Sequence, residues 1–273
     1  MLNQKVVDLK KEYGLQGGSL ECICIDVYNN GKRPAVVVVP GGGYEHCSER
    51  EATNVALAFV ARGFQAFVLR YKTVTDGVSY PEQLLELSAS LDYVRKNAAE
   101  FFVNPDEVFA VGFSAGGHLV ADLANEYMLV EEKYGKPLDC RPTAVGLSYP
   151  VIYHHGHAGS FTNLLKNLPE EEQARLLPTL NLDQRVTKDT APAFIWSTFE
   201  DQLVPCENAL RYALAMKEAG VQFALHIYPF GRHGISLADH EVSGAFDERA
   251  LEEDRGWVDE CAKFFRIYVE EKY

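Results

Sequence analysis

The stretch from Glu107 to Tyr127 reads EVFAVGFSAGGHLVADLANEY and carries the pattern G-x-S-x-G at its centre. Its apolar first part predicts a strand, and its second part has the apolar spacing of a helix. A serine on a sharp turn between a strand and a helix has a strained backbone, so the residues two positions away must be small, as Gly112 and Gly116 are. The helix that follows points its positive end toward negative charge developing beside the serine. Ser114 is therefore the candidate nucleophile, and a glycine-rich turn without chemistry is the alternative.

The same alternation of short apolar runs and longer helical patterns continues on both sides of this stretch. The predicted strands are Leu20–Tyr28, Ala35–Val39, Gln65–Arg70, Glu107–Gly112, Thr143–Ser148, Ala193–Thr198 and Gln222–Tyr228. The predicted helices are Glu49–Arg62, one that begins near Pro81, Ala115–Tyr127, Pro205–Ala219 and Asp254–Tyr268. This order predicts an α/β fold with a mostly parallel central sheet and helices on both faces. No repeat or linker divides the chain, so we expect residues 1–273 to form a single domain.

A nucleophilic serine needs a base and an orienting acid, which follow it in the order acid, then histidine, in this architecture. Asp201 lies just past one predicted strand and His233 just past the next, where loops at the carboxyl ends of parallel strands converge. We predict that Asp201 is the acid, with Glu200 as its rival and a helix cap as the alternative role. We predict that His233 is the base. Its rivals are His226, inside a predicted strand, and His240, further along the chain.

The glycine-rich segment Pro40-Gly-Gly-Gly-Tyr44 directly follows the most apolar predicted strand. An oxyanion hole needs two backbone N–H groups that point at one place without side chains in the way. We expect one from Ala115, directly after the candidate nucleophile, and the other from Gly42 or Gly43. The alternative is a phosphate-binding loop, but neither common glycine pattern for phosphate binding is present.

Composition and charge narrow the possible partners. The 273 residues are 47% hydrophobic and 24% charged, with 26 basic and 39 acidic side chains and a net charge of −13. Such an acidic surface disfavours nucleic acid, anionic membranes and polyanionic substrates. No apolar run approaches the roughly 20 residues that span a bilayer. The amino terminus lacks the apolar core of a secretory signal, so we expect a cytoplasmic protein. The six cysteines are scattered and expected to be reduced, with no metal or cofactor.

Further segments, in a fixed order along the chain, make a wider pattern. They are Val39-Pro-Gly-Gly-Gly-Tyr44, Ser48-Glu-Arg-Glu51, Ala66-Phe-Val-Leu-Arg-Tyr71, Gly112-Phe-Ser-Ala-Gly-Gly-His118, Leu147-Ser-Tyr-Pro-Val151, Gly159-Ser-Phe161, Asp201 with Val204-Pro205, and His233-Gly234. From about Leu20 to the last predicted helix, the sequence resembles the α/β-hydrolase esterases of the acetyl-xylan-esterase-like, or sugar-ester hydrolase, group. Two departures stand out. Pro40 replaces the histidine that precedes the glycines in many relatives, and Arg232 occupies the place of a second glycine.

The resemblance implies the α/β-hydrolase fold, with a small lid-like insertion at about 151–190. It implies that Ser114, Asp201 and His233 form the catalytic triad of a serine carboxylesterase that needs no cofactor. The implied reaction is deacetylation of acetylated sugars or oligosaccharides through an acyl-enzyme intermediate. The alternatives are an esterase of small esters, a peptidase of the same fold, and a non-catalytic binding protein on this scaffold. The sequence also leaves a homo-oligomer open.

Several other aromatic and histidine side chains are candidates for less certain roles. Tyr44 is predicted to bind substrate, and Trp196 to line the same pocket, with packing in the core as the alternative for both. His118, four residues after the candidate nucleophile, is expected to brace the packing of its helix. His154, His155 and His157 suggest a metal, but no acidic or thiol partner lies close in sequence. We predict no metal there and leave a pocket or surface role open for the three.

Overall fold

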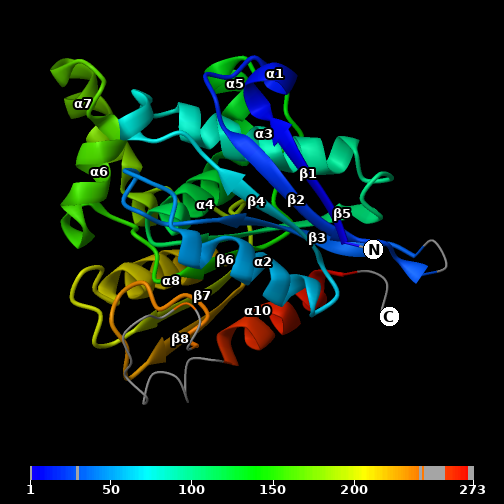
Figure 1. Cartoon of the computed structure of the whole chain (residues 1–273). Helices are drawn as coiled ribbons and strands as arrows, with labels where there is room; N and C mark the ends of the chain where they lie inside the picture. The colour runs from blue at the N-terminus through cyan, green and yellow to red at the C-terminus, as the bar shows by residue number, and fades with distance from the viewer. Residues whose placement is uncertain (1, 29–30, 240–241, 243–255, 270–273) are drawn as a thin grey trace.

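The computed structural model describes residues 2–28, 31–239, 242 and 256–269. Its centre is an eight-stranded sheet in the order β1-β2-β4-β3-β5-β6-β7-β8 (Figure 1). The strands are β1 (Leu2–Asp8), β2 (Ser19–Ile25), β3 (Arg33–Val39), β4 (Gln65–Arg70), β5 (Val103–Phe113), β6 (Val145–Ser148), β7 (Ala193–Thr198) and β8 (Phe223–Tyr228). The six strands from β3 onward pair in parallel, whereas β1 and β2 run antiparallel at one edge. The predicted α/β fold with a mostly parallel sheet is confirmed.

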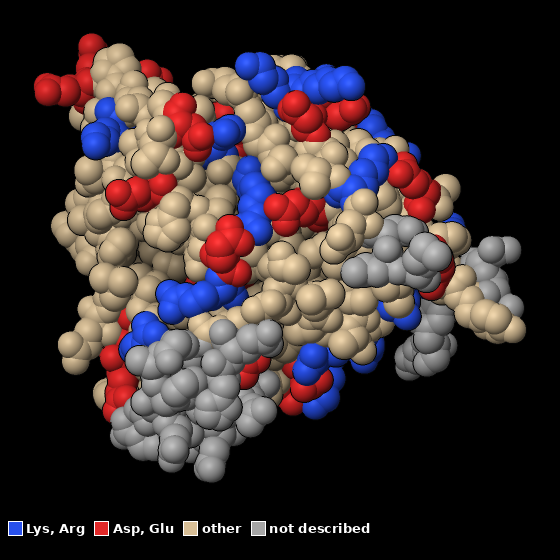
Figure 2. Space-filling view, in the orientation of Figure 1, with Lys and Arg blue, Asp and Glu red and all other residues tan. Residues whose placement is uncertain are grey.

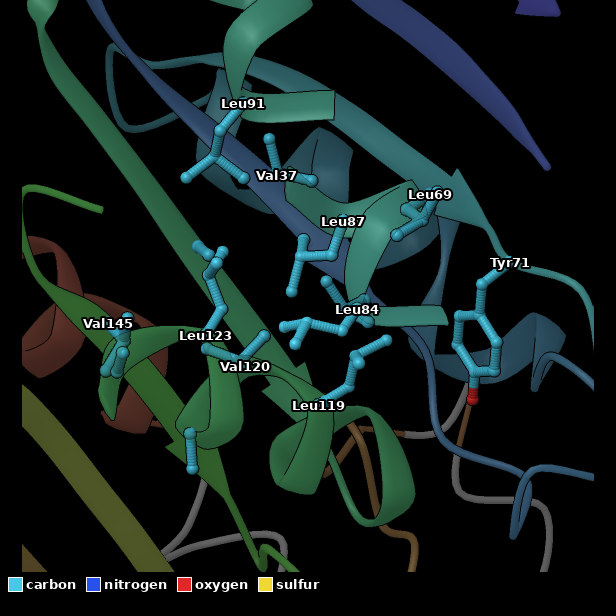
Figure 3. Packing of buried hydrophobic residues seen from close by; sticks show 14 of the residues in the cluster. Val37, Leu69, Tyr71, Leu84, Leu87, Leu91, Leu119, Val120, Leu123 and Val145 are labelled. Carbon is cyan, nitrogen blue, oxygen red and sulfur yellow. The ribbon is translucent and has the colours of Figure 1, made fainter. Parts of the chain in front are cut away.

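Helices cover both faces of this sheet (Figure 1). One face packs against α3 (Glu82–Lys96), α4 (Ala115–Glu126) and α8 (Glu207–Ala219), and the other against α2 (Thr53–Val60) and α10 (Trp257–Phe265). Strand β3 shows why two layers form, because Val37 belongs to the first core and Val36 to the second. Figure 3 shows Val37 facing Leu87 and Leu91 of α3. Each such side chain stabilises the fold by about 1.5–3 kcal/mol relative to an exposed one.

Most predicted elements are confirmed with small changes at their ends, and two differ more. The predicted helix Glu49–Arg62 is a short 3-10 turn, Glu49–Glu51, followed by α2 from Thr53. Strand β1 was not predicted, because LNQKVVD lacks the apolar run of a buried strand and pairs on one side only, with β2. The predicted last helix is confirmed over Trp257–Phe265, and its expected start at Asp254 lies outside the described residues.

A long connection between β6 and β7 contains α6 (Ala158–Leu165), α7 (Glu170–Leu176) and three short 3-10 turns. It corresponds to the insertion expected at about 151–190, and α6 and α7 project at one side of the molecule (Figure 1). Its contacts tie it to the core of the domain. The Asn125 side-chain amide of α4 donates to the Leu182 carbonyl at 3.1 Å, and the Leu164 carbonyl accepts the N–H of Tyr80. That this segment acts as a lid stays a prediction.

The cysteines and the lengths of the helices were also considered in the sequence. All six cysteines are free thiols, and five of them are buried. Within the described residues, no helix has the length and apolar character needed to cross a bilayer.

The turn from β5 into α4 is tightly packed against neighbouring backbone. Ser114 has φ 52° and ψ −116°, a conformation that side-chain-bearing residues rarely adopt. A methyl group on Gly112 would lie 2.2 Å from the Gly116 carbonyl oxygen, and one on Gly116 would lie 2.2 Å from the Val39 oxygen. Both contacts are with backbone, which cannot move aside. The G-x-S-x-G spacing is therefore a steric requirement of this turn.

We predict that Gly116→Ala lowers the free energy of unfolding by at least about 2 kcal/mol, because the added methyl overlaps two carbonyl groups. Gly256→Ala is the matched control, since no heavy atom lies within 4 Å of its added methyl. Urea denaturation of both variants measures the difference. Equal stability of the two variants would contradict this account of the turn.

Candidate active site

Three side chains that are far apart in sequence form one hydrogen-bonded chain. Ser114 Oγ lies 2.8 Å from His233 Nε2, and His233 Nδ1 lies 2.6 Å from Asp201 Oδ2. They follow β5, β8 and β7, so all three sit at the carboxyl end of the parallel strands, where sites in such sheets form. The carboxylate can only accept, so His233 donates from Nδ1 and its Nε2 accepts the Ser114 hydroxyl proton. This arrangement can activate a serine for nucleophilic attack.

The backbone of the β7–α8 loop holds the acid in place. Asp201 Oδ1 accepts the N–H groups of Leu203 at 3.0 Å and Val204 at 2.9 Å, which leaves Oδ2 for His233. The Asp201 side chain is fully buried, and that of His233 is 14% exposed. A carboxylate held by several donors cannot rotate away from the imidazole, so the ring orientation is fixed as well.

The rivals to these two residues lie elsewhere. Glu200 is exposed, and its carboxylate accepts the N–H of Gly231 at 3.4 Å rather than contacting His233. His226 packs in β8 with its ring 5.0 Å from that of Phe194. His240 lies outside the described residues.

The glycine loop lies directly against the turn at Ser114. A methyl on Gly41 would be 2.9 Å from Ser114 Cβ, and Gly42 and Gly43 have positive φ angles of 116° and 62°. The Gly41 N–H donates to Glu51 Oε2 at 2.8 Å. Within the described part of the chain, the N–H groups of Gly42, Gly43 and Ala115 have no protein acceptor. These are the amides that the sequence predicted for an oxyanion hole, and they stay candidates for it.

Tyr44 does not line the site, contrary to the prediction. It has a positive φ, of 60°, as Gly42 and Gly43 before it do. Its side chain lies in the core, where it is 1% exposed. Its hydroxyl donates to His118 Nδ1 at 2.8 Å, and His118 Nε2 donates to the Leu180 carbonyl at 3.0 Å. His118 therefore braces the helix as expected, and it also joins the glycine loop to the insertion. Trp196 is likewise a core residue, with its indole N–H on Ser148 Oγ at 2.8 Å.

The three histidines of the insertion contact nearby residues, and the charges of His233 and Asp201 also act on His157. The His154 ring packs against those of His155 and Phe161, at 5.2 and 5.5 Å. His157 Nδ1 accepts the Ser160 N–H at 3.3 Å and so caps α6. Among the residues with described coordinates, no group of three or more His, Cys, Asp or Glu side chains is placed to hold a metal ion.

Comparison with known proteins shows which family the chain belongs to. A family model described as the prolyl oligopeptidase family matches residues 86–251, more than half of the chain, and one described as BD-FAE matches residues 23–138. The crystal structure of an acetyl ester-xyloside bifunctional hydrolase from Caldicellulosiruptor lactoaceticus is 32% identical. It covers 92% of this chain and 88% of its own, with a TM-score of 0.78. The chain belongs to the α/β-hydrolase family of esterases.

Other known proteins are similar to this chain over different lengths. The carboxylesterase Cest-2923 from Lactobacillus plantarum is 25% identical, with both chains covered completely and a TM-score of 0.86. Endo-1,4-beta-xylanase B of Butyrivibrio fibrisolvens is 38% identical over 77% of this chain, and the acetylxylan esterase of Xylanibacter ruminicola is 30% identical over 81%. The matched regions span only 34% and 44% of those two curated relatives.

Two residues next to this candidate site were not predicted from the sequence. Glu51 is 3% exposed and bonds the glycine loop, and the ring of Tyr149 lies 5.0 Å from the His233 imidazole. Both lie in segments that carry the family resemblance. Nothing in the local pattern separates Glu51 from the exposed Glu49 two residues earlier.

Burial also sets the charge state of His118. It lowers the pKa of His118 from 6.5 to about 4, so the ring stays neutral while the unfolded chain takes up a proton. We predict that the free energy of unfolding falls as the pH drops from 6.5 toward 4. The share of this loss due to His118 is on the order of 3 kcal/mol.

His118→Gln tests this, because an amide can keep both hydrogen bonds but does not titrate. Denaturant unfolding near neutral pH and near pH 4 should show a smaller acid loss in the variant than in the wild type. The same loss in both proteins would show that His118 is not its source.

Proposed function

We propose that this protein is a serine carboxylesterase that removes acetyl groups from sugars or oligosaccharides through an acyl-enzyme intermediate. The observation that carries the proposal is the hydrogen-bonded chain from Ser114 through His233 to Asp201. Membership of the esterase family supports it independently of the geometry.

In the first half of the proposed reaction, Ser114 Oγ attacks the ester carbonyl carbon while His233 Nε2 takes the hydroxyl proton. The carbonyl oxygen becomes an oxyanion, which the N–H groups of Ala115 and of Gly42 or Gly43 stabilise. Asp201 holds the imidazole and stabilises its positive form. The bond from carbon to the alcohol oxygen then breaks, and His233 gives its proton to the departing alcohol.

The second half repeats these steps with water. His233 takes a proton from water, whose oxygen attacks the acyl carbon, and the bond from that carbon to Ser114 Oγ breaks. The proton returns to Ser114, and the free acid leaves. The same three side chains serve both halves, so no cofactor enters the proposal.

The preference for acetylated sugars is supported by the relatives. One is named an acetylxylan esterase and another an acetyl ester-xyloside hydrolase. On the face drawn in Figure 2, acidic and basic residues are interspersed, without a broad area of one sign among the coloured atoms. This face therefore has no broad area of one sign to attract a charged ligand, which is compatible with a neutral sugar ester.

A peptidase is the second candidate, because the matching family model is named for an oligopeptidase. A panel of acetylated xylo-oligosaccharides, short aryl esters and peptide amides distinguishes the two. Cleavage of the acetylated sugars with the highest kcat/KM is the expected result. Preferential cleavage of the amides would replace the proposed substrate class.

We predict that Ser114→Ala lowers kcat on a short aryl ester by roughly 10⁴-fold or more, because the attacking oxygen is lost. Ser88→Ala is the control, since Ser88 is also buried but lies in α3, where its hydroxyl donates to the Leu84 carbonyl. Steady-state kinetics of both variants provide the measurement. Near-normal turnover by Ser114→Ala would end the proposal.

A second prediction separates the two neighbouring acids. Asp201→Asn should lower kcat by roughly 10³–10⁴-fold, because an amide at this position favours the wrong imidazole tautomer. Glu200→Gln should stay within about threefold of the wild type, because Glu200 does not contact the imidazole. A large loss in Glu200→Gln with a small one in Asp201→Asn would reverse the assignment.

A further inference from the structure

One buried carboxylate contacts the loops on both sides of the candidate nucleophile. Glu51 is 3% exposed, at the end of the 3-10 turn before α2. Its Oε2 accepts the N–H of Gly41 at 2.8 Å, and its Oε1 accepts the hydroxyl of Tyr149 at 2.8 Å. Each oxygen has a different donor, and the donors come from segments far apart in the chain. A hydrogen bond to an ionised carboxylate is roughly twice as strong as one between neutral groups.

Tyr149 connects Glu51 to the loop of the base, which is the loop that carries His233 and Ser236. Its hydroxyl also accepts the Ser236 N–H at 3.0 Å, and its ring meets the His233 imidazole edge-on at 5.0 Å. Burial raises the pKa of Tyr149 well above its usual range, so the hydroxyl keeps the proton that it donates to Glu51. The Ser236 hydroxyl in turn donates to the Arg50 carbonyl, next to Glu51 in sequence. The loop of the base is thus joined to the Arg50–Glu51 turn at two places.

The backbone is strained at two residues of this hydrogen-bond network. Tyr149 and Ser236 have φ angles of +36° and +54°, in the region that glycine favours. Such residues cost roughly 1–3 kcal/mol each and persist where their surroundings fix them. The hydrogen bonds of Tyr149 and Ser236 to the Glu51 turn are interactions that can hold this strain.

At the glycine loop, the contact controls the direction of an amide. The Gly41 N–H points at Glu51, and the Gly41 carbonyl accepts the Ser48 N–H at 3.0 Å. The peptide groups on both sides of the Gly41 α-carbon are therefore fixed. Because the second of them carries the Gly42 N–H, fixing Gly41 also fixes where that candidate oxyanion donor points.

We propose that Glu51 is a positioning residue that sets the oxyanion loop and the His233 loop in their working orientation at the same time. The proposal rests on the proposed esterase function. Glu51 does not touch the reacting atoms in this role. It acts on one side through Gly41 and on the other through Tyr149.

The chain offers a matched control for the chemistry of this contact. Asp92 is 1% exposed and accepts the Asp139 N–H at 2.9 Å and the Tyr13 hydroxyl at 2.7 Å, the same pair of donor types. It also pairs with Lys96. Asp92 lies near the end of α3, which leads back to the amino end of β5, away from Ser114. The Asp92→Ala variant therefore shows how much stability is lost when a buried carboxylate is removed at a distance from the site.

The experiment compares Glu51→Ala and Glu51→Gln with Asp92→Ala in denaturant unfolding and in kinetics on an acetylated aryl ester. We expect similar shifts in the unfolding midpoint for the two alanine variants. We expect kcat of Glu51→Ala to fall about 10- to 100-fold with KM within about threefold, since the transition state loses aligned donors. Asp92→Ala should keep kcat within about twofold. Glu51→Gln, whose amide oxygen can still accept from Gly41, should recover part of the loss.

Unchanged kcat in a folded Glu51→Ala, or an equal loss in Asp92→Ala, would overturn the positioning role. If Glu51→Ala does not fold, Tyr149→Phe takes its place, because it removes the hydroxyl that joins Glu51 to Ser236 and leaves the bond from Gly41 to Glu51 intact. A kcat within about twofold of the wild type would then refute the role. Labelling of the wild type by a fluorophosphonate probe keeps the two hypotheses apart. A wild type that neither reacts with the probe nor turns over ester refutes the proposed function itself, whatever Glu51 does.

Discussion

The turn at Ser114 leaves no room for side chains on either side, and the rest of the site is arranged around it. Gly112 and Gly116 approach backbone carbonyls so closely that any methyl group would overlap them. This closeness brings α4 against the end of β3 and lays the glycine loop on the serine. The turn can be this tight because two hydrophobic layers hold β3, β5 and α4 rigidly together. The packing of the core therefore determines the geometry of the site.

The polar contacts around the turn share a common form. Each fixes a loop rather than an element of secondary structure, and two of the three join segments that are distant in sequence. Asp201 is held by its own loop backbone, His118 ties the glycine loop to the insertion, and Glu51 ties that loop to Tyr149. Loops at the strand ends can move unless such bonds hold them. The rigid sheet brings the loops to one edge, and the buried polar contacts set their final orientation.

Much of this could be predicted from the sequence, because regular periodicity and strand ends are local features. The run at Ala35–Val39 and the G-x-S-x-G turn indicate a buried parallel sheet, and chain order places Asp201 and His233 at neighbouring strand ends. The direction of a side chain, in contrast, cannot be read from the local sequence pattern. Tyr44 was expected to meet substrate, but a positive φ after two glycines turns it inward. The role of Glu51 depends on three segments meeting, which no spacing along the chain reveals.

In the proposed mechanism, the Ser114 hydroxyl takes the acyl group because His233 accepts its proton and Asp201 holds the imidazole. Rapid quenching of the enzyme during turnover of an acetyl ester, followed by peptide mass spectrometry, measures this directly. The expected result is one acetyl group on the peptide that contains Ser114, absent from Ser114→Ala and lost on further incubation in water. Turnover with no acetylated peptide, or with the acetyl group on another residue, would contradict it.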